Sequence, residues 1–191
     1  EATRDVLATI DVALTREQYV DWFMVHSMGA WHLAEEAGLS RAAIEQLRIS
    51  RDALYCDRLS TMPLLLPGVA DVLDELHGKY TMGVVTSAYK EHFDIIHQRT
   101  GLLRYFDFVL TGGDFTNFKP HPEPYLRAVA RAGVETAHCI AVEDTERGLR
   151  SARAAGIKCA VLPNPLAAGS SFALADYTLS TISDLLDVVS G

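Results

Sequence analysis

Two adjacent carboxylates, Glu143 and Asp144, stand where a predicted strand gives way to a predicted helix. Residues 139–142 form an apolar run typical of a strand buried on both faces, and residues 146–155 have a helical pattern that ends at Gly156. Ligands of open α/β sheets bind beyond the carboxyl ends of the strands. Neighbouring carboxylates repel each other unless a cation lies between them, and Mg²⁺ prefers a few carboxylates with water and substrate phosphate. The pair indicates a metal site; the alternative is an acidic surface pair that caps the next helix.

Hydroxyl side chains follow a second predicted strand. Thr86, Ser87 and Ala88 come directly after the apolar pair at 84–85. A hydroxyl together with free backbone N–H groups at a strand-to-helix turn can hold a phosphate oxygen, so all three residues are candidate substrate ligands. The alternative is that Ser87 simply caps the following helix.

A lysine, Lys119, lies in the loop after a third predicted strand at 106–110. A pair of glycines precedes it and three prolines follow within five residues, so its backbone has little freedom. A fixed ammonium can neutralise a phosphate and a carboxylate that are brought together. The alternative is an ordinary solvated lysine. Because a loop side chain offers little packing, we expect Lys119 to matter far more for activity than for stability.

Strands and helices alternate from about residue 63 to the end of the sequence. The predicted strands are 82–86, 106–110, 139–142, 157–162 and 177–179, and the predicted helices are 69–77, 90–99, 124–132, 146–155 and 182–189. Alternation of this kind predicts an α/β fold, in which a parallel sheet is covered by helices on both faces.

The first 60 residues have a different, all-helical pattern. Thr15 and Ser40 are placed to cap helices, and no strand is predicted. Two prolines and a glycine within residues 62–68 form a stiff junction. We therefore predict a helical lobe at 1–62 and an α/β core at 63–191.

The composition narrows the classes of partner. The 191 residues include 25 acidic and 17 basic residues, a net charge of −8, which argues against nucleic acid or an anionic membrane as partner. The three cysteines are far apart and indicate neither a disulfide framework nor a zinc site. No apolar run is long enough for a membrane span and the first residues are not a signal peptide. We expect a cytoplasmic enzyme, a monomer or a weak dimer, with a small-molecule substrate.

Hydroxyl, lysine and acid pair, each at the end of a successive strand, together resemble the haloacid dehalogenase superfamily. The resemblance covers residues 63 to about 165. The segments that carry it are Pro67-Gly68-Val69, Gly83 to Ser87, Lys119 to Tyr125, Val142 to Gly148 and Ala152 to Gly156. The helical lobe resembles the small α-helical cap of the subgroup that contains phosphoglycolate phosphatase and β-phosphoglucomutase.

The resemblance implies a Rossmann-like, doubly wound core and aspartyl-phosphate chemistry. Thr86 or Ser87 would be the hydroxyl that binds phosphate. Lys119 would bind the phosphoryl oxygens and the nucleophile, and Glu143 and Asp144 would hold Mg²⁺.

The sequence departs from the family at its first motif. The family carries Asp-x-Asp-x-Thr/Val at the end of the first core strand, with the nucleophile as its first aspartate, and no such motif occurs among the 191 residues. Without that central strand, neighbouring strands would expose unpaired backbone. We therefore expect that roughly 15 to 30 N-terminal residues, about one strand and a turn, are missing from this sequence.

The expected function is a Mg²⁺-dependent phosphatase of a small phosphorylated metabolite, acting through an aspartyl-phosphate whose aspartate lies in that missing segment. One alternative is a phosphomutase of the same family. A dehalogenase is disfavoured, because displacement of halide from carbon needs no divalent metal. The other alternative is a pseudoenzyme, inactive because the nucleophile is truly absent.

Overall fold

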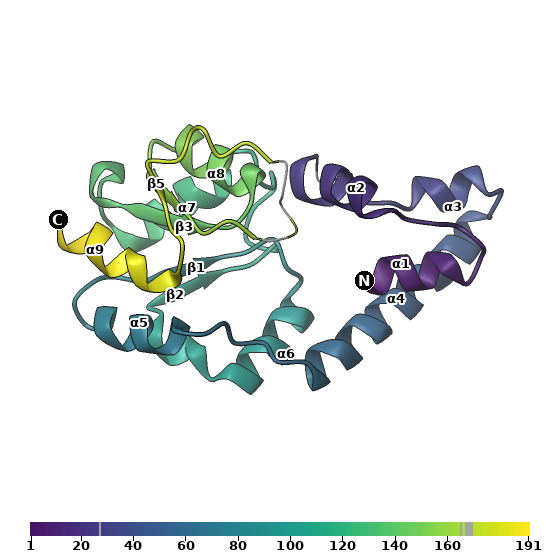
Figure 1. Cartoon of the computed structure of the whole chain (residues 1–191), viewed down its shortest axis with the longest axis horizontal. Coiled ribbons are helices and arrows are strands. Elements are labelled where there is room, and N and C mark those ends of the chain that lie inside the picture. Colours follow the sequence, from purple (N-terminus) through teal and green to yellow (C-terminus); the bar gives the residue numbers. More distant parts are fainter. Residues whose placement is uncertain (27, 165, 167–169) are drawn as a thin grey trace. The chain divides into compact units, whose positions relative to one another are not determined.

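The computed structural model describes residues 1–26, 28–164, 166 and 170–191 and divides into two compact units, Glu1–Pro63 and Leu64–Gly191 (Figure 1). The boundary predicted from the sequence lies one residue earlier. We describe each unit by itself.

The first unit is built from helices. They are α1 (Ala2–Ala8), α2 (Arg16–Tyr19), the π-helix η1 (Val20–Val25), α3 (His32–Glu36) and α4 (Arg41–Thr61). The predicted caps are confirmed: the Thr15 hydroxyl accepts the N–H of Gln18 at 3.2 Å, and the Ser40 hydroxyl accepts that of Ala43 at 3.3 Å. The sequence did not predict the π-helix, which continues directly from α2. An apolar core closes the unit around Leu7, Leu14, Ala30, Ala34 and Ile44.

The second unit alternates strands and helices as predicted. Its strands are β1 (Gly83–Val85), β2 (Phe108–Leu110), β3 (Ile140–Glu143), β4 (Lys158–Val161) and β5 (Tyr177–Thr178). Its α-helices are α5 (Val69–Leu76), α6 (Lys90–Thr100), α7 (Glu123–Ala132), α8 (Glu146–Ala154) and α9 (Leu185–Ser190). Short 3₁₀ turns occur at η2 (Leu102–Tyr105), η3 (Thr136–His138) and η5 (Ile182–Asp184). Most strands are shorter than predicted, and the last predicted helix opens with η5.

The sheet of β3, β4 and β5 is parallel, and its middle strand β4 is buried on both faces. Side chains of successive strand residues point to opposite faces. Accordingly Cys159 and Val161 of β4 pack in one apolar cluster with α7 and α8, whereas Ala160 between them packs in another with α5 and α9 (Figure 1). Helices on both faces explain why residues 159–162 are all apolar.

The strands β1 and β2 form a second, separate parallel pair. Among the residues that the structure describes, β1 pairs only with β2, and β3 pairs only with β4. Between β1 and β3 lies a cavity of about 710 Å³ lined largely by apolar side chains of both strands and of α5 and α7. The parallel strands predicted from the sequence are present, but they lie in two sheets, because no described strand bridges β1 and β3.

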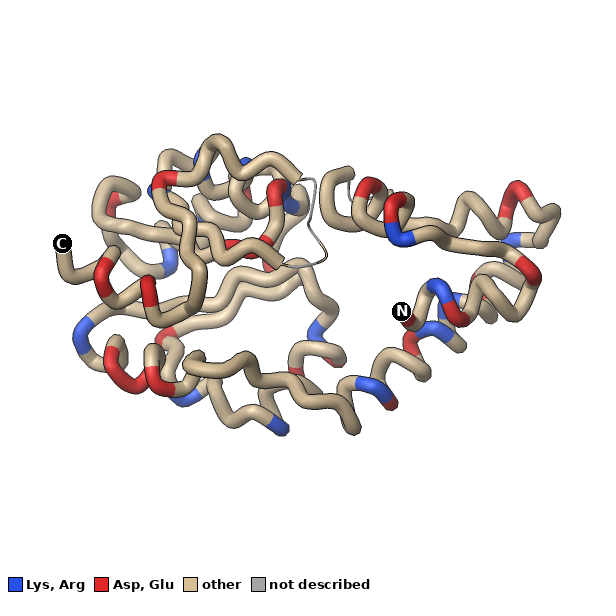
Figure 2. The backbone as a smooth tube through the Cα atoms, in the orientation of Figure 1, with Lys and Arg blue, Asp and Glu red and all other residues tan. Residues whose placement is uncertain are grey.

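Charged residues are distributed over both units. Figure 2 shows Asp and Glu interspersed with Lys and Arg along the backbone of each. No helix in the described part of the chain is long and apolar enough to cross a membrane.

Candidate active site

Five of the six residues singled out from the sequence, all but Ala88, line one pocket at the carboxyl ends of β1, β3 and β4. Its volume is about 340 Å³. Both hydroxyls, the lysine and the two acids belong to its lining, although they come from three separate stretches of sequence. The lining residues are Val85, Thr86, Ser87, Lys119, Val142, Glu143, Asp144, Thr145, Arg147 and Leu162.

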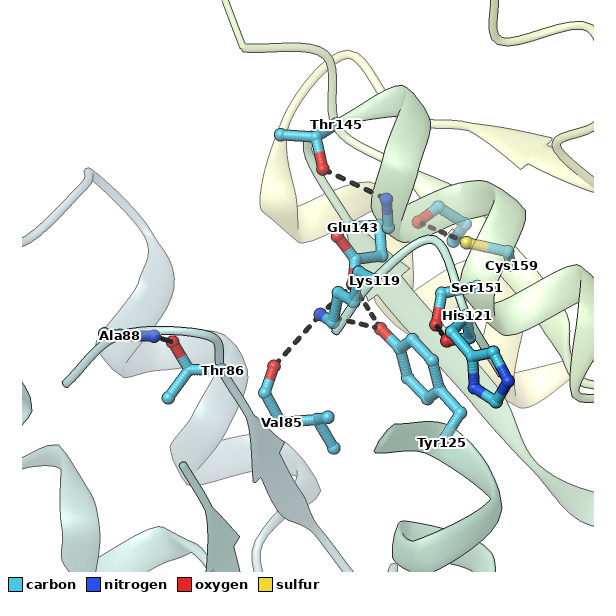
Figure 3. Close-up of polar contacts among 12 residues, drawn as sticks. Val85, Thr86, Ala88, Lys119, His121, Tyr125, Glu143, Thr145, Ser151 and Cys159 are labelled. Carbon is cyan, nitrogen blue, oxygen red and sulfur yellow. Dashed lines mark hydrogen bonds and ion pairs between the residues drawn. The ribbon is translucent and has the colours of Figure 1, made fainter. Parts of the chain in front are cut away.

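Lys119 is buried and lies between the ends of the two sheets. It is only 8% exposed, and its ammonium donates to the carbonyl oxygen of Val85 at 3.0 Å, at the end of β1 (Figure 3). The same ammonium forms an ion pair with the carboxylate of Glu143, at the end of β3. The alternative of a solvated lysine is therefore wrong, and so is our expectation that Lys119 contributes little to packing.

Glu143 is also buried, at 8% exposure, and its carboxylate points into the protein. Its Oε1 accepts hydrogen bonds from Lys119 and from the hydroxyl of Tyr125 on α7 (Figure 3). Its Oε2 lies against Gly148 of α8, where an added Cβ would be 1.8 Å from that oxygen. Residue 148 must therefore be glycine for the carboxylate to keep this position.

Tyr125 completes this buried group. Burial, followed by the nearby charge of Glu143, raises the pKa of Tyr125 well above its ordinary value, so the hydroxyl stays protonated and donates. Its oxygen is 3.5 Å from the ammonium of Lys119. The neighbouring Cys159 is fully buried, and burial raises the pKa of its thiol to about 12, so the thiol stays protonated.

The two candidate hydroxyls have different surroundings. Thr86 Oγ1 accepts the N–H of Ala88 at 3.1 Å, which leaves the hydroxyl proton available but engages the N–H of Ala88 within the turn. Ser87 Oγ is buried and has no hydrogen-bond partner among the described atoms. The first helical residue after this turn is Lys90, and Tyr89 precedes it as N-cap, so Ser87 is not the helix cap. A buried hydroxyl without a partner beside a lysine suits an incoming oxygen ligand.

Asp144 differs from its neighbour in being exposed. One carboxylate oxygen accepts a hydrogen bond from the side-chain amide of Asn164 at 3.1 Å, and α8 is capped by Thr145, whose hydroxyl accepts the N–H of Gly148 at 3.2 Å. The alternative that the acid pair caps the helix is therefore wrong.

The donor set decides which metal the pocket would suit. Among the described residues, no group of three or more His, Cys, Asp or Glu side chains is placed to hold a metal ion. Mg²⁺ does not need one, because it keeps several waters and binds through one or two carboxylates plus substrate phosphate. The exposed oxygens of Asp144 fit that requirement, whereas the carboxylate of Glu143 is engaged by Lys119 and Tyr125.

Three residues at or beside the pocket escaped the sequence analysis as site residues. Tyr125 lies within a stretch that carries the family resemblance, but spacing alone does not direct its hydroxyl at Glu143. Asn164 had a usable signal, since it is a polar residue just beyond the end of β4. Arg147 lines the pocket from the first turn of α8.

Comparison with known proteins identifies the family. A model of the haloacid dehalogenase-like hydrolases matches residues 13–162, which is more than half of the chain. The chain belongs to this family. The resemblance predicted from the sequence is thereby confirmed. The subgroup is confirmed as well, because a phosphoglycolate phosphatase and a β-phosphoglucomutase are among the similar proteins.

The relatives are longer than the matched segment. This haloacid dehalogenase-like chain is 30% identical to protein CbbY of Rhodobacter capsulatus over 154 residues, covering 77% of the chain and 67% of that protein. It is 32% identical to phosphoglycolate phosphatase of Salmonella paratyphi A over 150 residues, which are 75% of the chain but only 60% of the relative. The crystal structure of CbbY from Rhodobacter sphaeroides in complex with phosphate shares the fold, with a TM-score of 0.80, 22% identity and coverage of 96% and 87% of the two chains.

Proposed function

We propose that this protein is a Mg²⁺-dependent phosphatase of small phosphorylated metabolites that acts through an aspartyl-phosphate. The observation that carries the proposal is the convergence of hydroxyl, ammonium and carboxylate groups on one pocket of about 340 Å³. The similarity to a phosphoglycolate phosphatase supports a small anionic substrate.

The phosphoryl group would lie against the turn after β1. Thr86 offers a hydroxyl proton, and the buried hydroxyl of Ser87 offers a donor that has no described partner. Lys119 supplies a fixed positive charge, and Arg147 adds a second one to the lining. Such preorganised donors stabilise the charge of a phosphoryl group in transfer more than they stabilise the free substrate.

The acids would serve the metal. Asp144 would hold Mg²⁺ through its exposed carboxylate, with Asn164 fixing the orientation of that carboxylate. Glu143 would join Asp144 only after release from Lys119. When bound, Mg²⁺ neutralises phosphate charge, so an anionic nucleophile can approach.

The nucleophile would come from a further strand, outside residues 1–191, in the cavity between β1 and β3. Strands β1 and β3 each present an edge to this cavity that no described strand pairs with, and such an edge is a template for one more strand. Val85 and Val142 line both the cavity and the pocket. A strand parallel to β1 and β3 would thus end in the pocket and deliver a carboxylate to it.

The helical unit would act as a cap that selects the substrate, with residues 63–68 as the hinge. The residues that would bind the phosphate all belong to the second unit. We therefore assign recognition of the rest of the substrate to the helical unit. A moving cap also controls which acceptor reaches the phosphorylated aspartate. Distance probes on the two units should change separation when Mg²⁺ and fluoroberyllate are added to the natural protein. An unchanged separation despite ligand binding would contradict a moving cap.

The phosphatase proposal is tested by Asp144→Asn in the natural protein. We expect loss of Mg²⁺-dependent hydrolysis of a generic phosphate ester by more than about a hundredfold, with an unchanged melting temperature. Asp187→Asn, on the exposed side of α9, is the matched control and should keep full activity. Retained turnover in Asp144→Asn, or activity that survives EDTA, would overturn the assignment.

The intact mass of the natural protein tests the added strand. A mass above 20.9 kDa by one strand and turn supports it. A mass of 20.9 kDa together with no turnover would favour the pseudoenzyme, and transfer of phosphate to a second sugar position would favour the mutase.

A further inference from the structure

Two oppositely charged side chains of the pocket lining, Lys119 and Glu143, are bound to each other. The Lys119 and Glu143 side chains are only 10% and 6% exposed, and they form an ion pair (Figure 3). Tyr125 donates to the same carboxylate oxygen, and Gly148 leaves no room on the other side. Each charge therefore satisfies the other in a place with little water.

This pairing sets the conditions for ligand binding. A phosphate that draws Lys119 to itself weakens the pairing of Lys119 with the buried carboxylate of Glu143, and a cation that draws Glu143 to itself removes the opposite charge from Lys119. Uncompensated buried charge is strongly unfavourable. When both ligands bind, Lys119 meets the phosphate and Glu143 meets the cation. Neither buried charge is then left without an opposite charge.

The other ligands of the pocket are not restricted in this way. Asp144 is exposed and bonded only to a neutral amide in the hydrogen bonds described, and Ser87 carries a buried hydroxyl without a described partner. Before the ion pair opens, Asp144 can thus give the cation a first, weaker contact, and Ser87 can do the same for the phosphate.

We propose that the Lys119–Glu143 ion pair couples the two halves of the site, so that the phosphoryl group and the divalent cation bind cooperatively by exchanging this pair for two new ones. The inference rests on the proposed function, because it takes phosphate and Mg²⁺ as the ligands. Coupling between two ligands is reciprocal and is typically about 5- to 150-fold in affinity. The pair also keeps Glu143 from the metal until phosphate arrives, which favours metal capture with substrate present.

Calorimetric titration of MgCl₂ into the protein, with and without inorganic phosphate, measures this coupling. We expect phosphate to tighten Mg²⁺ binding by about 5- to 150-fold. Direct contact between phosphate and metal would also contribute, so the decisive comparison is made without phosphate. There, Lys119→Met should tighten Mg²⁺ binding about tenfold, because it frees Glu143.

A double-mutant cycle separates release of Glu143 from the simple removal of a positive charge. Charge removal acts equally whether or not residue 143 is acidic, so Lys119→Met should change Mg²⁺ affinity much less in the Glu143→Gln background. Lys119→Gln, which keeps a donor for Glu143, provides a better-packed second variant should Lys119→Met fold poorly. Thermal melts of all variants identify any that do not fold.

The outcomes distinguish this inference from the function beneath it. If Lys119→Met changes Mg²⁺ affinity equally in the wild-type and the Glu143→Gln backgrounds, while Mg²⁺ binding still depends on Asp144, the ion-pair exchange is overturned and the proposed function is not. A protein that binds no Mg²⁺ with phosphate present, or whose Mg²⁺ binding is unaffected by Asp144→Asn, overturns the proposed function and the exchange together.

Discussion

The two sheets of the core unit differ in how far they are covered. Cys159, Ala160 and Val161 of β4 are all 0% exposed, with helices packed on both faces. In β1, by contrast, Gly83 is exposed and the two valines that follow are only half-buried. The middle strand of one sheet is covered on both faces, whereas β1 of the other lies along the cavity of about 710 Å³ that also borders β3.

The difference separates stability from chemistry. Apolar burial on both faces makes β4 the firm part of the unit. The candidate site lies where the two sheets approach, at the ends of β1 and β3, and the side chain of Lys119 contacts both ends. Val142, although it lies within β3, is 41% exposed at this same place. The site therefore occupies the least complete part of the sheet region.

Breaking the link made by Lys119 should have the largest effect on stability. Lys119→Ala leaves the buried carboxylate of Glu143 unpaired, so we expect the free energy of unfolding to fall by about 3–5 kcal/mol in urea denaturation. Lys158→Ala, an exposed lysine at the other end of β4, is the control and should change it by less than about 0.5 kcal/mol.

A second variant shows whether charge is the cause. Lys119→Met combined with Glu143→Gln removes both charges and should recover most of the lost stability. A Lys119→Ala protein as stable as the wild type would mean that Lys119 does not join the two sheets.

The sequence predicted which residues line the pocket better than it predicted their partners. Thr86, Lys119, Glu143 and Asp144 could be found because each follows a strand, and parallel strands end at the same edge of a sheet. The pairing of Lys119 with Glu143 could not be found, since 24 residues separate them and side-chain direction depends on the packed structure. The sequence thus showed which groups meet but not which of them neutralise each other.

The break between the sheets has a similar explanation. Apolar alternation predicts that a strand exists and which faces it buries, but not which strand lies beside it. The stretch at 82–86 looks as apolar as that at 157–162. Coverage of their faces, which distinguishes them in the structure, is set by elements far away in the sequence.

The difference in coverage itself can be measured with matched valine substitutions. Val161→Ala removes buried methyl groups and leaves a cavity, so we expect a loss of about 2 kcal/mol in the free energy of unfolding. Val84→Ala removes the same atoms from half-buried β1 and should cost about 1 kcal/mol or less. Equal losses would show that β1 is as well packed as β4 and would contradict the comparison.

The smallest expected effect concerns the loop that brings Lys119 to the site. Glu123, at the start of α7, accepts hydrogen bonds from the N–H groups of Thr116 and Asn117, both at 3.0 Å. These bonds, the one from Thr116 first, lower the pKa of Glu123 from 4.5 to about 2. Because the pKa is lower in the folded protein, the stabilisation is complete above about pH 4.5 and is lost as the pH falls towards 2.

Glu123→Gln should therefore flatten the acid side of the stability profile. We expect the free energy of unfolding to fall less steeply between about pH 5 and pH 2 in this variant than in the wild type, because Gln has no proton to bind. The effect should be modest, since the carboxylate is near solvent and its bonds are screened. Urea denaturation at several pH values gives the two slopes. Identical slopes would mean that Glu123 does not hold this loop through its charge, and that the prolines alone fix the position of Lys119.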